Sequence, residues 1–224
     1  MTPLRIVRRA LETGLDMIAV SDHNSAANAE VAMELGRRSG LSVLPAMEIS
    51  SREEAHVLAV FGSLEDALSM QESVYADLRE GPEGRSEWQV IVNAEEEVLG
   101  FERRMLLGAT GKTLEELVNE IRTRGGLAIA SHVDREAFSV MSQLGFVPGD
   151  VTFDGFEVID PKRARQGVML HPDVPWVRSS DAHRLADMGR RATVLEAQAP
   201  DFTELALALR GEGGRSVRPE DICS

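Results

Sequence analysis

The fold is indicated by MIAVSDH (residues 17–23), a short apolar run that ends in polar side chains. The same arrangement returns at LAIASH (residues 127–132) and at VRSSDAH (residues 177–183). A histidine therefore follows each of three predicted strands. In a parallel α/β barrel the carboxyl ends of the strands converge on one face, where side chains from separate strands build the site. We expect the three histidines to meet at such a face.

Short apolar runs alternate with amphipathic segments along the chain, which is typical of βα units and a mostly parallel sheet. Thr113, three residues before Glu116, indicates a capping box at the start of one helix. Helices are predicted over 4–12, 25–38, 64–79, 113–124 and 202–209. Strands are predicted over 17–20, 42–44, 56–61, 90–92, 127–130, 153–158, 176–179 and 193–195. We interpret residues 1–224 as one domain with an insertion at about 62–118 and a loosely ordered tail at about 211–224.

The composition is that of an ordinary globular protein, with 43% hydrophobic and 27% charged residues among 224. The net charge is −13, from 24 Lys and Arg against 37 Asp and Glu. Because nucleic-acid binding uses clustered cationic side chains, we expect no stable binding to duplex nucleic acid. Aromatic residues, at 4%, are too few for a base-stacking platform.

The apolar runs are far shorter than the roughly 20 residues that span a bilayer, so no membrane association is expected. The first residues carry arginines without an apolar segment behind them, and we predict no secretory signal. The single cysteine, Cys223, has no partner for a disulfide within the chain. This cysteine usage is typical of a cytoplasmic protein.

A metal site is the chemistry that the polar strand ends share. Glu48 follows a predicted strand at 43–46, and His56 opens the next strand. Imidazole nitrogens and carboxylate oxygens suit zinc, manganese or iron. A single histidine is more often an ordinary core or surface residue, but three recurrences with neighbouring acids favour metal binding. The candidate ligands are His23, Glu48, His56, His132, Asp181 and His183.

Other catalytic classes find less support in the sequence. No G-x-S-x-G nucleophile elbow is present, which argues against a serine hydrolase of that type. The chain also lacks the glycine patterns that bind nucleotide phosphates and dinucleotides. Hydrolysis assisted by metal ions therefore stays the favoured chemistry.

Four strings resemble the later motifs of the PHP (polymerase and histidinol phosphatase) superfamily: IAVSDHNS, LPAMEIS followed by HVLAVF, AIASHVDRE, and SSDAH. The resemblance covers nearly the whole chain. It implies a distorted (β/α)7 barrel that holds up to three divalent metal ions and hydrolyses phosphate esters. By the same resemblance the motif residues are His23 in the second motif, Glu48 and His56 in the third, His132 in the next, and Asp181 with His183 in the final Asp-x-His.

One family motif has no counterpart in the sequence. Family members begin with a strand that ends in His-x-His, followed by a further ligand and by a segment like TPL (residues 2–4), where this chain starts. The resemblance therefore implies a barrel without its first strand. We expect the true start codon to lie upstream, so that the chain is a truncated reading of the gene; a protein with an incomplete site is the alternative.

The resemblance implies a metal-dependent phosphoesterase that hydrolyses a small phosphomonoester, or a nucleotide or oligonucleotide phosphate, with metal-activated water. Asp22 is expected to orient a neighbouring ligand. Arg135 and Arg184 follow ligand motifs and are candidates for binding the substrate phosphate, with a solvated salt bridge as the alternative for each. Glu157 is interpreted as an ordinary strand residue. Two other functions stay open, an inactive scaffold or ligand-sensing module and a metal-dependent hydrolase of non-phosphate substrates.

Overall fold

The protein is described by a computed structural model over residues 1–82, 88–160, 171 and 173–220. Its strands are β1 (Met17–His23), β2 (Ser42–Ser50), β3 (His56–Val60), β4 (Gln89–Val92), β5 (Val98–Glu102), β6 (Leu127–Ala130), β7 (Gly155–Glu157), β8 (Trp176–Val177), β9 (Ala192–Glu196) and β10 (Ser216–Glu220). Its helices are α1 (Pro3–Glu12), α2 (Ala29–Ser39), α3 (Leu64–Tyr75), α4 (Leu114–Thr123), α5 (Val140–Leu144), α7 (Phe202–Arg210) and the 3₁₀ helix η1 (Leu185–Asp187).

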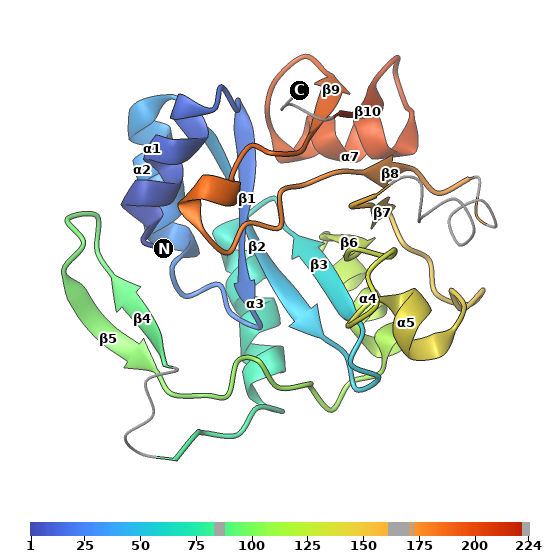
Figure 1. Cartoon of the computed structure of the whole chain (residues 1–224), viewed down its shortest axis with the longest axis horizontal. Helices are drawn as coiled ribbons and strands as arrows, with labels where there is room; N and C mark the ends of the chain where they lie inside the picture. The colour runs from blue at the N-terminus through green and yellow to red at the C-terminus, as the bar shows by residue number, and fades with distance from the viewer. Residues whose placement is uncertain (83–87, 161–170, 172, 221–224) are drawn as a thin grey trace.

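A curled mixed sheet of six strands forms the centre, with the order β1-β2-β3-β6-β7-β8 (Figure 1). The β1–β2, β6–β7 and β7–β8 pairs are parallel, as the alternation of elements predicts. Strand β3 runs antiparallel to both of its neighbours. The start of β3 therefore lies at the same edge as the end of β2, and Ser50 pairs with His56 there.

The two faces of the sheet have different environments, because alternate side chains of a strand point to opposite faces. On β3, Val57 and Ala59 belong to the main core, which is formed with α3 and α4. Leu58 and Val60 instead face the inner side of the curled sheet, where α7 closes one end. The inner apolar layer also contains Met17, Leu44, Ala46, Leu127 and Ile129.

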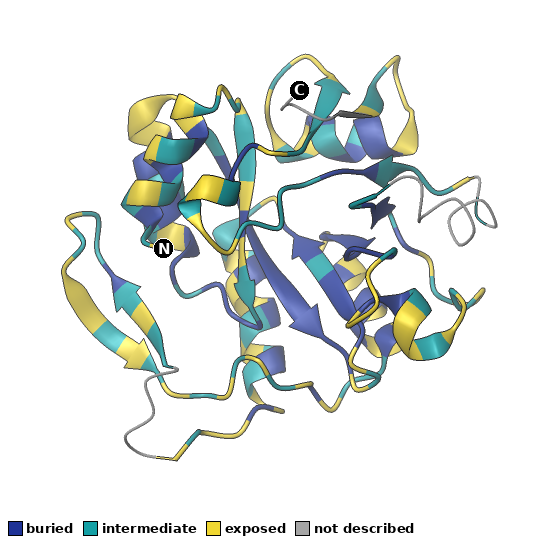
Figure 2. Cartoon of the chain, viewed as in Figure 1, coloured by how far each residue is buried: buried dark blue, intermediate teal, exposed yellow. Residues whose placement is uncertain are grey.

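The helices shield this sheet from solvent, and Figure 2 shows the central strands as its most buried part. Helices α1 and α2 pack together beside β1 and β2, around Val7, Val20 and Leu35. Helix α3 packs on β2, and α4 packs on β3 and β6. No helix among the described residues is both long and apolar enough to traverse a lipid bilayer.

The β4–β5 hairpin stands out from the body of the molecule (Figure 1) and lies within the insertion that we expect at 62–118. Helix α2 begins at Ala29, later than the predicted residue 25, because residues before it contact this hairpin. Ser25 Oγ donates to Gln89 Oε1 at 2.7 Å, and Asn28 Nδ2 donates to the Val90 carbonyl at 3.0 Å. These bonds hold residues 25–28 in a turn.

Among the described residues, four regular elements differ from the expected list. Strand β5, the short helix α5 and the 3₁₀ helix η1 are present in segments where we predict no element. The tail is expected to be loosely ordered from about 211, but residues 216–220 form β10 against β9 in an antiparallel register. Backbone pairing with a neighbouring strand orders this segment, and local composition carries no signal for such a partner.

The capping box predicted at Thr113 is confirmed. The Thr113 hydroxyl accepts from the Glu116 N–H at 3.1 Å, and the Glu116 carboxylate accepts from the Thr113 N–H at 2.7 Å. Replacing Thr113 with Ala should therefore lower the free energy of unfolding by about 1 kcal/mol. Urea unfolding followed by circular dichroism measures this change.

The matched control for the cap is Thr123→Ala at the other end of α4. The Thr123 hydroxyl only donates back to the Asn119 carbonyl, at 2.8 Å, so its removal should change stability by less than about 0.5 kcal/mol. Equal losses at the two threonines would contradict the capping role of Thr113.

Candidate metal centre

Polar side chains form a ring where the inner face of the sheet opens. His23 lies on the same face of β1 as Met17, and Glu48 lies on the same face of β2 as Leu44 and Ala46, because each pair is separated by an even number of residues. His56 likewise shares the face of Leu58 and Val60. The side chains on the inner face of these strands thus change from apolar to ionisable at this edge of the sheet.

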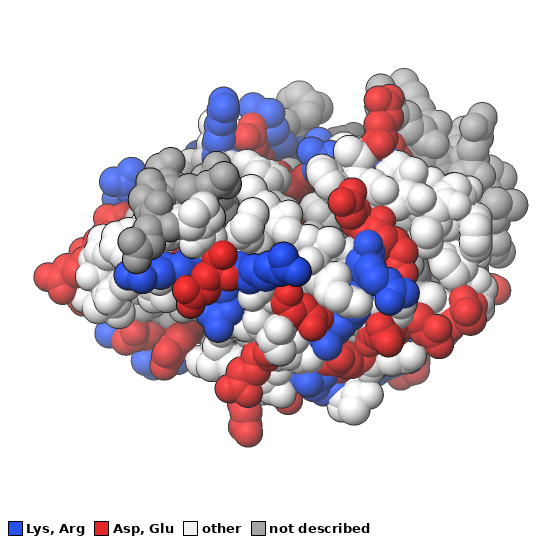
Figure 3. Space-filling view, turned by 90° about the horizontal axis from the view of Figure 1, so that it is seen from below, with Lys and Arg blue, Asp and Glu red and all other residues white. Residues whose placement is uncertain are grey.

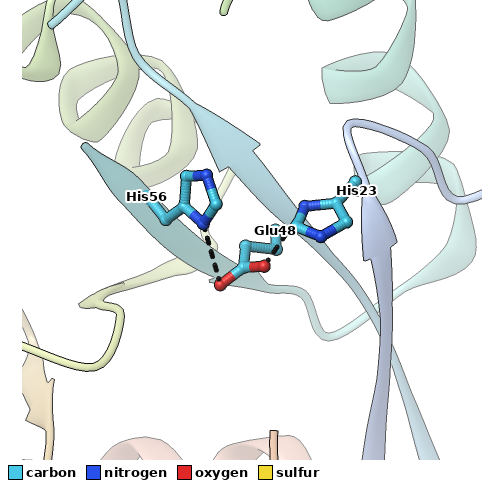
Figure 4. A group of neighbouring side chains, drawn as sticks. All are labelled: His23, Glu48 and His56. Carbon is cyan, nitrogen blue, oxygen red and sulfur yellow. Dashed lines mark ion pairs between the residues drawn. The ribbon is translucent and has the colours of Figure 1, made fainter. Parts of the chain in front are cut away.

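His23, Glu48 and His56 bring ligand-type atoms within 4.8 Å of one another. Figure 4 shows the two imidazoles on either side of the Glu48 carboxylate. The Nδ1 atom of His23 lies 3.3 Å from Oε2 of Glu48, and the Nδ1 atom of His56 lies 3.5 Å from Oε1. The His132 Nε2 atom lies 3.3 Å from the same Oε1. One carboxylate therefore contacts three imidazoles from three strand ends.

Three buried ring nitrogens in this cluster form no hydrogen bond among the described residues: Nδ1 of His132, and Nδ1 of His23 and of His56, which lie in ion-pair range of Glu48 but outside hydrogen-bond geometry. Buried polar atoms are nearly always hydrogen-bonded, so each exception requires an explanation. Neutral imidazole nitrogen and carboxylate oxygen are also the donor set that binds zinc, manganese and iron. The cluster is therefore suited to a divalent cation.

Burial and mutual contact set the ionisation of the cluster. Burial opposes ionisation of Glu48, but the imidazoles of His132 and His56 outweigh it and hold the pKa of the carboxyl below its usual range. Burial lowers the pKa of His23. For His132, burial acts in the same direction, yet the contact with Glu48 raises its pKa. Glu48 is thus a carboxylate at neutral pH, as a metal ligand must be.

Asp181 and His183 lie at the outer side of the cluster. The rings of His183 and His23 are 6.0 Å apart between centroids, and His183 Nδ1 lies 3.7 Å from Oδ1 of Asp181. The other oxygen of Asp181 accepts from the Arg135 guanidinium at 2.7 Å. All six candidate ligands therefore belong to one connected group, although Asp181 forms an ion pair with Arg135.

Left-handed backbone occurs at two strand-end turns that carry candidate ligands. His132 has φ of 31° and Asp181 has φ of 43°, values that residues other than glycine seldom adopt. Such conformations cost of order 1–3 kcal/mol and cluster at functional sites. Both turns thus hold their side chains in place at an energetic cost.

Asp22 faces away from the candidate ligands and accepts a hydrogen bond from the Gln89 amide of the hairpin. Burial raises the pKa of Asp22. Because His23 follows it directly, this contact anchors the end of β1 to the hairpin. The geometry is compatible with the orienting role that we expect for Asp22.

Glu157 belongs to the ring of polar side chains on the inner face of the sheet, although the sequence alone predicts an ordinary strand residue. Its Oε2 atom accepts from the His132 backbone N–H at 2.9 Å, and its Oε1 atom accepts from the Ser179 hydroxyl. Burial raises the pKa of this carboxyl. The strand alternation could have identified it, since Phe156 and Val158 both face the main core and leave Glu157 on the inner face.

Asn24 is a second residue that sequence reasoning missed. It is fully buried, with φ of 50°. Its side chain donates to the carbonyls of Leu106 and Gly108, each at 2.8 Å, and accepts from the Ser50 N–H at 3.1 Å. Asn24 therefore joins the ends of β1 and β2 to the loop before α4.

Replacing Asn24 with Ala should lower the free energy of unfolding by about 1–3 kcal/mol, because one buried and two partly buried backbone groups lose their partner. Replacing Asn24 with Gly removes the same hydrogen bonds but accepts the left-handed backbone without strain. The Gly variant should therefore be the more stable of the two in urea unfolding. The same stability for Ala and Gly would show that backbone strain contributes nothing at this position.

A cavity of 310 Å³ lies beside Asp181 and His183. It is lined by Arg135, one of the two arginines that we predict to contact substrate, and by Arg190 and Arg191. Arg184, the other predicted arginine, is exposed and is not among the residues that line the cavity. Arg190 pairs with Asp187 at 2.9 Å, and Arg191 donates to the Ser179 carbonyl at 3.0 Å.

No family model matches the chain. The chain is 34% identical over 116 residues to the uncharacterized protein YqxK of Bacillus subtilis, with 48% of this chain and 29% of YqxK aligned. Endonuclease Q from Pyrococcus furiosus, described as lesion-specific, matches with a TM-score of 0.74 at 20% identity, over 97% of this chain and 53% of that one. Endonuclease Q is also described in complex with a 27-mer duplex that has an abasic lesion at the active site.

A protein from Bifidobacterium adolescentis assigned as a metal-dependent phosphoesterase matches with a TM-score of 0.58 at 17% identity, over 93% of this chain and 91% of that one. The chain shares its fold with Endonuclease Q and with this phosphoesterase. It spans about half the length of Endonuclease Q and less than a third of YqxK. At these identities the likeness to solved structures concerns the fold alone.

Proposed function

We propose that this chain carries a metal-dependent phosphoesterase site of the PHP type. The observation that supports this most directly is the contact of one carboxylate, Glu48, with three imidazoles whose buried Nδ1 atoms make no well-formed hydrogen bond to any described residue. An arrangement built only for stability would satisfy these nitrogens. The donor set fits zinc, manganese or iron.

In this proposal Glu48, His23 and His56 hold one divalent cation, and His132, Asp181 and His183 supply further ligands around it. A bound cation of this kind contributes Lewis-acid stabilisation of phosphoryl oxygens and a more acidic water. Glu157 keeps the His132 turn in position through the backbone N–H. Asp22 holds the end of β1 against the hairpin. We further propose that residues 1–224 belong to one domain with a (β/α)7-type barrel.

Arg135 is the arginine that we propose for substrate binding. It lines the 310 Å³ cavity beside Asp181 and is largely exposed. A guanidinium can bind two oxygens of a phosphate at once. Binding of a cation by Asp181 would then release Arg135 from its present ion pair. The free guanidinium would contact the phosphate of the substrate. Arg184 has no comparable position, and we propose it only as a residue of the outer rim.

The charge distribution favours small or single-stranded phosphate esters. In Figure 3, which looks at the molecule from below, acidic and basic side chains are mixed across the visible face. The net charge of −13 opposes approach of a long polyanion. The proposed substrates are therefore a phosphomonoester, a nucleotide or a short oligonucleotide.

The test is metal analysis and hydrolysis with the same protein sample. The chain is loaded with zinc or manganese, desalted, and analysed by plasma mass spectrometry, and hydrolysis of p-nitrophenyl phosphate and bis(p-nitrophenyl) phosphate is followed by absorbance. We expect retained metal and metal-dependent hydrolysis. Absence of both would contradict the proposal. Retained metal without hydrolysis of either ester would favour the inactive, ligand-sensing alternative.

A further inference from the structure

Phe138 is an exposed aromatic side chain that lies directly against the candidate metal centre. Its ring stacks on the ring of His56, with centroids 4.9 Å apart and planes 9° from parallel. The residue is nevertheless 47% exposed. His56 covers one face of the ring, so the exposed area lies on the rest of the residue.

The chain holds this ring in place at an energetic cost. Phe138 has φ of 58°, a left-handed conformation that is unusual for a bulky side chain. Its carbonyl accepts from the His56 N–H at 2.8 Å. The next residue, Ser139, caps α5 and donates from its hydroxyl to the Arg135 carbonyl at 2.8 Å. The turn is thus fixed on both sides of the exposed ring.

The same turn also carries an arginine, a side chain of the type that binds phosphate. His132, Arg135 and Phe138 follow one another at intervals of three residues after β6. His132 points to Glu48, Arg135 pairs with Asp181 beside the cavity, and Phe138 covers His56. An aromatic surface and a guanidinium therefore border the metal centre from one short segment.

We propose that Phe138 is the stacking surface for a nucleobase of the substrate, so that the site takes phosphate esters that carry a base. This inference rests on the proposed function and narrows its substrate class. Stacking tolerates any base, because each base has a π-face. The low aromatic content still argues against a platform for several bases, but a single ring beside the metal centre serves one base.

The first experiment compares two esters that differ only in the base. These are the p-nitrophenyl ester of thymidine 5′-phosphate and the same ester of 1,2-dideoxyribose 5-phosphate, each assayed with the metal-loaded chain. Phe138→Leu keeps the apolar bulk and removes the aromatic plane. Phe146→Leu is the matched control, because Phe146 is 60% exposed and its ring stacks on no histidine among the described residues.

For Phe138→Leu we expect kcat/KM on the thymidine ester to fall on the order of 10-fold, mainly through KM, since stacking of a base on an aromatic side chain contributes that much to binding. The base-free ester should change by less than about twofold. An equal loss on both esters would overturn the inference, because it would show that Phe138 only supports His56.

A second measurement does not depend on hydrolysis. Phe138→Trp places a fluorescent ring at the same position, and thymidine 5′-phosphate should quench its emission while deoxyribose 5-phosphate should not. The unsubstituted chain, with Trp88 and Trp176, gives the background. No quenching by the nucleotide would overturn the inference. If the unsubstituted chain hydrolyses neither ester, the proposed function fails, and this measurement still decides whether a base stacks on residue 138.

Discussion

Glu48→Gln should weaken the affinity for zinc or manganese by more than about 100-fold. Removing a residue that only hydrogen-bonds to a metal ligand already lowers metal affinity by about 10–100-fold, and Glu48 is proposed as a ligand itself. The amide keeps the shape of the side chain but removes the charge that contacts three imidazoles. Hydrolysis of phosphate esters should fall with the metal content. Metal titration and initial rates measure the two effects on one sample.

The matched control for Glu48 is Glu115→Gln, a change of the same type at an exposed position on α4. It should leave metal retention and hydrolysis at the level of the unsubstituted chain. Circular dichroism should show a folded protein for both variants. The metal centre would have to be placed elsewhere if Glu48→Gln kept the metal content and the rates of the control.

Phe156→Ala should lower the free energy of unfolding by about 3–5 kcal/mol, the range for removal of a buried aromatic ring. The side chain is 1% exposed and packs edge to face on Phe153, with centroids 5.9 Å apart. It also precedes Glu157, so the cavity would loosen the strand that supports the His132 turn. Urea unfolding followed by circular dichroism measures the loss.

Phe146→Ala is the control for the core position, because Phe146 is 60% exposed. It should change the free energy of unfolding by no more than about 0.5 kcal/mol. Losses of similar size at Phe146 and Phe156 would contradict the placement of the core under β7.

The histidines at strand ends could be predicted from local sequence, since apolar runs that end in Ser-Asp-His, Ser-His and Asp-x-His are visible without a structure. The capping box at Thr113 could be predicted for the same reason, because its hydrogen bonds join residues three apart. His56 could not be placed in this way. Its position beside Glu48 requires β3 to run antiparallel to β2.

Local pattern by itself determined the six strands of the central sheet and the side chains at their ends, because apolar periodicity is encoded within a few neighbouring residues. Only the tertiary structure decided which of these side chains contact one another. The three imidazoles around Glu48, the hydrogen bond from the His132 turn to Glu157, and the links of Asn24 to a loop about 80 residues away depend on strand order and direction. Such contacts arise from packing between distant segments, and no single segment carries that information.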